Sequence, residues 1–228
     1  LDLPPKIYTS EYIELTRKQR ILYKEIRQGI VDNLENILEI PNPLSCTVRL
    51  RQLTGGVFGD DNPKLERVKD MLEEITESGH KALIFSQWEQ VTSVYKEALK
   101  AYNPAYIVGA VDPEDRQKEV DRFQNNPTCK VAIGTIGAMG TGLTMTAASY
   151  VFFVDKRYWD AENKQAEDRA HRIGTTNTVN VVSLVATNTV DEGIEEMLRD
   201  NKALFDRVVE GKGSRVDMGE ILRKILQY

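Results

Sequence analysis

The sequence predicts an α/β protein built on a doubly wound parallel sheet. From residue 64 onward, short apolar runs rich in β-branched residues alternate with longer segments whose apolar residues recur at helical spacing. Strands separated by helices in this way pair in parallel, with helices on both faces of the sheet. The five predicted strands are 81–86, 106–109, 130–135, 151–154 and 179–185.

The predicted helices fill the gaps between these strands. Asp112 followed by Pro113 is typical of a helix start, because the carboxylate can cap the first turn and proline fits there. The predicted helices are one that ends at Gly79, one over 89–101, one from Asp112 to about Asn125, and two closing helices near 190–210 and 217–227.

Three regions are predicted along the chain. Residues 1–58 show helical spacing and no strand pattern, which indicates an all-helical N-terminal appendage. A glycine-rich loop over 55–63 is the best boundary. The predicted domains are therefore 1–58, an α/β domain over 59–188, and C-terminal helices over 189–228.

Composition narrows the class of protein. The net charge of −5 argues against a general nucleic-acid coat protein, although it leaves room for a local basic track. Cys46 and Cys129 are isolated, and with only two histidines the sequence predicts no metal site. No apolar run approaches the ~20 residues that span a bilayer, so we expect no membrane partner. The chain begins at Leu1 and not at Met, which is expected for a fragment of a longer protein or for a processed product.

Polar, glycine-rich and cationic segments follow the predicted strands. Ligands of parallel sheets gather at the carboxyl ends of the strands, so these segments should share one edge. The segment Gly134–Gly142, which we call the glycine turn, is either an anion cradle or a tight loop with glycines at positive φ. The segments are Ser86–Trp88, Gly109–Arg116, Gly134–Gly142 and Asp155–Trp159.

The stretch from Gln165 to Gly174 is predicted to form one short helix. At about 100° per residue, Gln165, Arg169 and Arg172 fall on one stripe, and Gly174 supplies a stop. Paired arginines on a rigid base suit phosphate groups. The alternative is a solvated face in which Asp168 pairs with Arg172. The residues alone leave both interpretations open.

No phosphate loop accompanies these arginines. The pattern G-x-x-x-x-G-K-[ST] is absent, and the glycine turn follows a middle strand, unlike a dinucleotide fingerprint that opens a sheet. A nicotinamide oxidoreductase is thereby disfavoured. Guanidiniums without a cradle predict half of a composite site, whose other half lies elsewhere in the parent protein.

Four blocks of the sequence follow one another in a recognisable order: Lys81–Trp88, Val131–Asp155, Asp155–Trp159 and Gln165–Gly174. They resemble, in turn, block IV, block V, the linking block and block VI of the second RecA-like lobe of Swi/Snf-type ATPases, within helicase superfamily two. The appendage is similar to the segment that joins the two lobes, and the residues after Thr189 resemble the closing brace helix. The resemblance implies a P-loop NTPase-type fold without a Walker A loop.

The resemblance implies an ATP-hydrolysing enzyme in the full-length protein. ATP with Mg²⁺ would be bound mainly by an N-terminal RecA-like lobe, so this fragment alone should be inactive. Arg169 and Arg172 would act as arginine fingers and Gln165 would orient the nucleotide. Gly140, Gly142 and Leu143 would line the same cleft.

Double-stranded DNA is the second implied partner, as the track of a translocase. From the residues alone, Arg116 could equally form a surface ion pair with Asp112 or Glu119 in place of a DNA contact, and Trp88 is part of the core or the cleft wall. The alternative to a working motor is a catalytically inactive relic of the lobe that binds DNA or a partner. The implied DNA contacts are Ser86, Gln87, Gly109, Arg116, Thr135 and Trp159.

Some residues depart from the family pattern. Trp159-Asp160-Ala161 stands where the family usually has Trp-Asn-Pro, and Thr144 replaces the usual asparagine after Gly-Leu. Thr175 replaces a glutamine. These departures favour a compact motor of a bacterial or phage-infected cell, located in the cytoplasm; a eukaryotic version would be nuclear.

Overall fold

The computed structural model describes residues 3–35, 43–140 and 142–209 of the chain. Two compact units are present. The sheet unit comprises Leu1–Glu11 and Lys64–Leu184, and the helical unit comprises Tyr12–Pro63 and Val185–Tyr228. The predicted domain limits at 58/59 and 188/189 stay a prediction.

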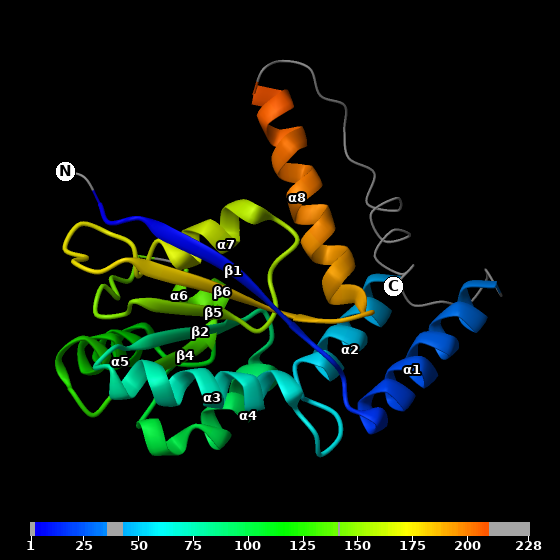
Figure 1. Ribbon diagram of the computed structural model, residues 1–228, viewed down its shortest axis with the longest axis horizontal. Coiled ribbons are helices and arrows are strands. Elements are labelled where there is room, and N and C mark those ends of the chain that lie inside the picture. Colours follow the sequence, from blue (N-terminus) through cyan, green and yellow to red (C-terminus); the bar gives the residue numbers. More distant parts are fainter. Residues whose placement is uncertain (1–2, 36–42, 141, 210–228) are drawn as a thin grey trace. The chain divides into compact units, whose positions relative to one another are not determined.

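A single six-stranded parallel sheet, with strand order β1-β6-β5-β2-β4-β3, organises the fold (Figure 1). The central strand β2 pairs in parallel with β4 and β5, with Ser86 opposite Thr135 and Phe85 opposite Phe153. All five predicted strands are confirmed. The strands are β1 Lys6–Ile13, β2 Ala82–Ser86, β3 Ala105–Ile107, β4 Val131–Thr135, β5 Tyr150–Phe153 and β6 Val179–Ala186.

Helices cover both faces of the sheet, which confirms the predicted doubly wound fold. From β2, helix α4 crosses to β3, and α5 then returns to β4 in the opposite direction, so right-handed crossovers place these two helices on opposite faces. The helices of this part are α3 Pro63–Glu77, α4 Glu89–Ala98, the 3₁₀ turn η1 Lys100–Tyr102, α5 Pro113–Asn125, α6 Ile136–Met139 and α7 Asp160–Glu167.

The main hydrophobic cluster lies under α5, α6 and α7. It joins Leu83 and Phe85 of β2 to Phe123 of α5 and Ala166 of α7, and all four residues are fully buried. Phe85 stacks on Phe153 with ring centroids 5.4 Å apart. This packing fixes the carboxyl ends of β2, β4 and β5, where the polar segments begin.

The prediction that residues 1–58 are all helical is wrong for Lys6–Ile13, which form the edge strand β1. Two backbone bonds define its pairing: Val179 N–H donates to the Pro5 carbonyl (3.2 Å) and Thr187 N–H to the Ile13 carbonyl (2.9 Å). Both partners advance by eight residues, so β1 runs parallel to β6. One side of an edge strand stays open, and most of β1 is exposed, which leaves little hydrophobic alternation to read.

The helical unit contains α1 Arg17–Glu35, α2 Pro43–Thr54 and α8 Val190–Val209. The buried Tyr23 hydroxyl accepts a hydrogen bond from Val190 N–H (2.8 Å), and the buried Asp191 carboxylate accepts one from Thr54 (3.3 Å). The helix predicted near 190–210 is confirmed, because α8 spans Val190–Val209. The second predicted closing helix, over 217–227, lies outside the described residues.

Candidate functional site

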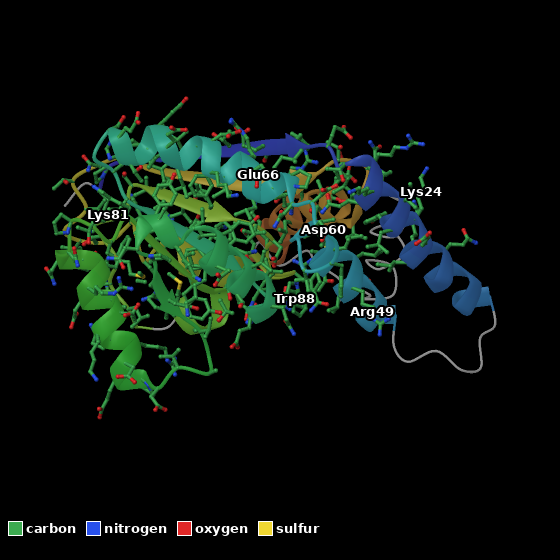
Figure 2. The ribbon with its side chains drawn as sticks, turned by 90° about the horizontal axis from the view of Figure 1, so that it is seen from below. Lys24, Arg49, Asp60, Glu66, Lys81 and Trp88 are labelled. Atoms are coloured by element: carbon green, nitrogen blue, oxygen red, sulfur yellow. The ribbon has the colours of Figure 1, made fainter. Side chains whose placement is uncertain are left out.

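The carboxyl ends of the central strands carry the candidate site, as the sequence predicts. Figure 2 labels Lys81 and Trp88, which lie at the two ends of β2, and the polar segments lie at the Trp88 end. The parallel register sets Gln87 beside the residues that follow Thr135 and Phe153. Three chain segments therefore emerge next to one another at this edge.

The glycine turn after β4 opens with a single helical turn, α6. Thr135 Oγ1 caps it by accepting a hydrogen bond from Ala138 N–H (3.3 Å). Gly140 ends it so tightly that a Cβ there would lie 2.5 Å from the Ile136 carbonyl oxygen. Gly142 then takes a φ of +71° and is exposed. Glycine is needed at both positions to turn the chain back toward β5.

The predicted helix over 165–174 is wrong in its second half, because α7 ends at Glu167. Arg169 N–H and Ala170 N–H donate three residues back, to Ala166 (3.1 Å) and Glu167 (3.1 Å), so the last turn tightens. Thr175 Oγ1 then accepts from Arg172 N–H (3.1 Å) and donates to the Ala170 carbonyl (2.6 Å). We call Asp168–Arg172 the arginine turn.

The structure nevertheless brings the two predicted arginines to the glycine turn. Nη1 of Arg169 donates to the Leu143 carbonyl (3.2 Å), and Nη1 of Arg172 donates to Thr144 Oγ1 (3.1 Å). Met145 N–H donates to the Arg169 carbonyl (2.9 Å). The two predicted arginines therefore lie against Leu143 and Thr144, directly after the glycine turn.

The guanidiniums of this site are incompletely bonded. Within the described part of the chain, Nη2 of Arg169 and both Nε and Nη2 of Arg172 have no protein acceptor. Burial lowers the pKa of Arg169, the Arg172 charge lowers it further, and Asp168 acts in the opposite direction. Asp168 pairs with Lys6 (2.5 Å) and not with Arg172, so the predicted helical ion pair is absent here.

An open depression of about 400 Å³ lies over the arginine turn. Gln165 is exposed beside it, and its backbone carbonyl accepts from Arg169 Nε (3.1 Å). This arrangement can bind an anion, because fixed N–H donors with unspent positive charge face solvent. The lining residues are Leu3, Asp168, Arg169, His171, Arg172 and Ile173.

The predicted DNA-contact residues fall into two groups. Ser86 is fully buried, and its hydroxyl donates to the buried carboxylate of Asp155. That carboxylate also accepts from Gln87 N–H (2.8 Å). Sequence reasoning gave Asp155 no role, although a carboxylate directly after the apolar run 151–154 was the available signal. Ser86 thus shapes the loop after β2 and offers no hydroxyl to solvent.

The other predicted contacts lie closer to the surface. Gly109 and Trp159 are exposed, Trp159 by 55% of its surface, and Thr135 and Arg116 are half-buried. Arg116 Nε donates to the Val111 carbonyl (2.8 Å), and Glu119 is engaged by Arg122 and by Tyr106 N–H. Neither predicted ion pair of Arg116 is found among the described residues.

The donor set of this edge fits phosphate oxygens and does not fit a divalent cation. Among residues 3–35, 43–140 and 142–209, no group of three His, Cys, Asp or Glu residues is placed to hold a metal ion. Over the same residues, no helix is long and apolar enough to cross a membrane.

Residues 63–174 match the family model of the helicase conserved C-terminal domain, and this range includes every block that forms the site. Over 98% of the chain, the fold matches a Sulfolobus solfataricus SWI2/SNF2 ATPase core in complex with double-stranded DNA, with a TM-score of 0.76 and 28% identity over 50% of that chain. The chain belongs to the C-terminal helicase lobes of the Swi/Snf type.

Other members of the Swi/Snf type support this assignment. The lobe is 34% identical to Arabidopsis thaliana protein chromatin remodeling 19, covering 97% of this chain and 32% of that protein. It is 28% identical to the putative ATP-dependent helicase/translocase YwqA of Bacillus subtilis, covering 93% of this chain and 25% of that protein. The lobe thus spans about a quarter to a third of these relatives.

Proposed function

We propose that this lobe supplies the arginine half of a composite ATPase site in a double-stranded DNA translocase. The observation that carries the proposal is the pair Arg169 and Arg172, bonded to Leu143 and Thr144 just after the glycine turn, with N–H donors that have no acceptor among the described residues. Those donors match the charge that develops on phosphate oxygens during phosphoryl transfer. The lobe has no phosphate loop of its own, so the nucleotide must be cradled by another lobe.

ATP is the proposed substrate, and the residues present divide its recognition. Arg169 and Arg172 would contact phosphate oxygens, and Gly140, Gly142 and Leu143 would line the nucleotide cleft beside them; the bond from Arg169 to the Leu143 carbonyl supports this. Mg²⁺ does not fit this cationic edge, so no step here passes through it. The relatives named as ATP-dependent helicases or translocases support the nucleotide assignment.

The proposed DNA track lies along the same carboxyl edge. The exposed Trp159 and the half-buried Thr135 and Gln87 are the available contacts, with Gly109 and Arg116 on the neighbouring connection. A related ATPase core has been solved in complex with double-stranded DNA, which supports the assignment. Most such contacts would reach phosphates and sugars, so we expect binding with little sequence preference.

The decisive experiment uses the full-length protein. Arg172→Ala should lower DNA-stimulated ATP hydrolysis by roughly 10³- to 10⁵-fold, because an arginine finger acts mainly in the transition state. ATP binding, measured with a fluorescent analogue, should change little. The matched control is Lys118→Ala, which removes a cation from an exposed pair with Asp115 on α5.

Two results would overturn the proposal. One is unchanged turnover in the Arg172→Ala protein. The other is full DNA-stimulated turnover by the 228-residue chain alone, since a complete site cannot be half of a composite one. A full-length protein that binds DNA and never hydrolyses ATP would instead identify the lobe as an inactive relic.

A further inference from the structure

The edge strand β1 is bonded directly to the arginine turn. Nζ of Lys6 lies 3.2 Å from Glu167 Oε1 and 2.5 Å from Asp168 Oδ1. These two carboxylates belong to the residue that ends α7 and the residue that begins the turn. One ammonium group therefore joins two residues that lie more than 160 positions away in sequence.

Glu167 is the centre of this contact. Its side chain is only 4% exposed, and the Tyr8 hydroxyl donates to the same Oε1 atom at 3.0 Å. Burial raises the pKa of Glu167, while Lys6 and Tyr8 oppose that rise. A buried carboxylate with two partners on one strand has little freedom to move away from that strand.

A third hydrogen bond joins the N-terminal residues to the far side of the arginine turn. Nε2 of His171 donates to the Pro4 carbonyl at 2.5 Å. Leu3, just ahead in the chain, lines the depression over the arginines. Residues 3–8 thus contact the residues on both sides of Arg169 in sequence, and they form no hydrogen bond with the guanidinium of Arg169 or Arg172.

The backbone of Glu167 transmits its position to the turn. Its carbonyl accepts from Ala170 N–H (3.1 Å) and from His171 N–H (3.2 Å). Displacing Glu167 therefore displaces the peptide groups of Ala170 and His171, which lie between the two arginines. Catalysis that depends on fixed charges is sensitive to such shifts, and about 1 Å of misplacement can cost roughly 10²-fold in rate.

We propose that β1 is a positioning strand for the arginine turn, in which Lys6 and Tyr8 act through Glu167 to hold Arg169 and Arg172 in place. This inference rests on the function proposed above. Lys6 and Tyr8 are positioning residues, because neither reaches the nucleotide-facing donors. The first residues of the sheet unit would in this way control the turnover of a site formed by its last blocks.

The test compares kcat with KM in the full-length protein. The double variant Lys6→Met/Glu167→Gln removes the ion pair without leaving a buried charge behind. We expect its kcat to fall roughly 10- to 100-fold, with KM for ATP and affinity for DNA within about twofold. The single variant Lys6→Arg, with Glu167 unchanged, should retain most of the wild-type rate, because it keeps a cation within reach of both carboxylates.

A matched control separates positioning from general loss of charge. Lys118→Met breaks an ion pair whose two side chains are 74% and 58% exposed, and it should leave kcat unchanged. Hydrogen exchange of the full-length protein gives a second measurement. The peptide covering residues 164–175 should exchange faster in the double variant than in the wild type or the control.

Each outcome decides the proposal. A folded double variant with wild-type kcat, or with only a raised KM, overturns it, as does unchanged exchange over residues 164–175. Arg172→Ala, measured alongside, distinguishes the two proposals. If Arg172→Ala abolishes turnover while the double variant keeps the wild-type kcat, the positioning strand fails and the composite site stands. If Arg172→Ala retains turnover, both fail.

Discussion

Arg122 and the pair Arg169/Arg172 show two opposite uses of a guanidinium in one sheet unit. Arg122 on α5 is fully bonded. It holds both Glu119 oxygens (3.1 and 2.7 Å), the carbonyl and side-chain oxygens of Asn103 (3.1 and 3.0 Å), and the Pro104 carbonyl (2.8 Å). It ties α5 to the loop ahead of β3.

The arginine turn differs in both bonding and charge. Among the described residues, the side chains of Arg169 and Arg172 donate three hydrogen bonds to the protein between them, and the two charges lie close enough to oppose each other. The Glu119 hydrogen bond raises the pKa of Arg122, whereas burial and Arg172 lower that of Arg169. Within the described part of the chain, Arg122 is therefore paired with a carboxylate, and Arg169 and Arg172 are not.

This difference indicates how a structural arginine can be told from a functional one. Saturated donors beside a carboxylate stabilise the fold and leave nothing for a ligand. Unsaturated donors beside a second cation cost some stability, and an external phosphate relieves that cost. Three further measurements test this difference between Arg122 and the pair Arg169/Arg172.

The largest expected effect is on stability. Arg122→Ala should lower the free energy of unfolding by about 2–3 kcal/mol, because it removes the guanidinium from the Glu119 carboxylate and leaves the Asn103 and Pro104 carbonyls without that donor. Arg172→Ala should change it by less than about 0.5 kcal/mol, since that side chain is exposed and bonded once. Urea unfolding of the chain measures both. Equal losses in the two variants would remove the distinction.

The next effect is the pH dependence of the Glu119 clamp. Burial tends to raise the Glu119 pKa, but hydrogen bonds from Arg122 and Tyr106 N–H outweigh it, and the pKa is lowered from 4.5. A lowered folded-state pKa contributes stability above the unfolded-state value and loses it as pH falls. Glu119→Gln should cost about 1 kcal/mol at pH 7. Its urea midpoint should decline less than wild type below pH 4.5.

Glu167 supplies the contrast for that experiment. Its pKa is raised, so stability linked to it is present below the unfolded-state value and falls as pH rises through the folded-state value. Glu167→Gln should therefore lose less stability than the wild type as the pH rises from the unfolded-state pKa of Glu167 to its folded-state pKa. Parallel pH curves for the two glutamine variants would contradict the opposite pKa shifts.

The smallest expected effect is anion binding by the chain itself. If sulfate occupies the arginine turn with a Kd near ~20 mM, then ~20 mM sulfate adds about 0.4 kcal/mol to the free energy of unfolding. The gain should vanish in Arg169→Ala/Arg172→Ala and persist in Arg122→Ala. Chloride at equal ionic strength controls for screening, and an equal gain in all three proteins would assign the effect to general exclusion.

Periodicity located most of this fold correctly. The runs at 81–86 and 130–135 are continuous and apolar, and they became buried central strands whose neighbours on both sides favour the same conformation. Strand β1 was not predicted, because its residues are mostly exposed and its conformation depends on β6, far away in sequence. Edge strands carry little of the pattern that marks central ones.

The site was predicted in composition and mistaken in detail. Gln165, Arg169 and Arg172 have helical spacing, yet α7 ends at Glu167, after which Thr175 bonds backbone groups of the turn and Lys6 pairs with Asp168. Ser86 was placed on a DNA-facing edge, but its hydroxyl donates to Asp155. Lys6 and Asp155 are far in sequence from their partners, so local spacing does not reveal these two contacts.

The alternating α/β order, the absence of a phosphate loop and the residues that carry charge at the carboxyl edge can all be read from the amino-acid sequence. These are local properties, set by periodicity and side-chain chemistry. The approach of Arg169 and Arg172 to Leu143 and Thr144, and the bonds from Lys6 and Tyr8 to Glu167, depend on how the chain packs. Those contacts join residues 26 to 161 positions apart, and only the packed sheet brings such segments within bonding distance.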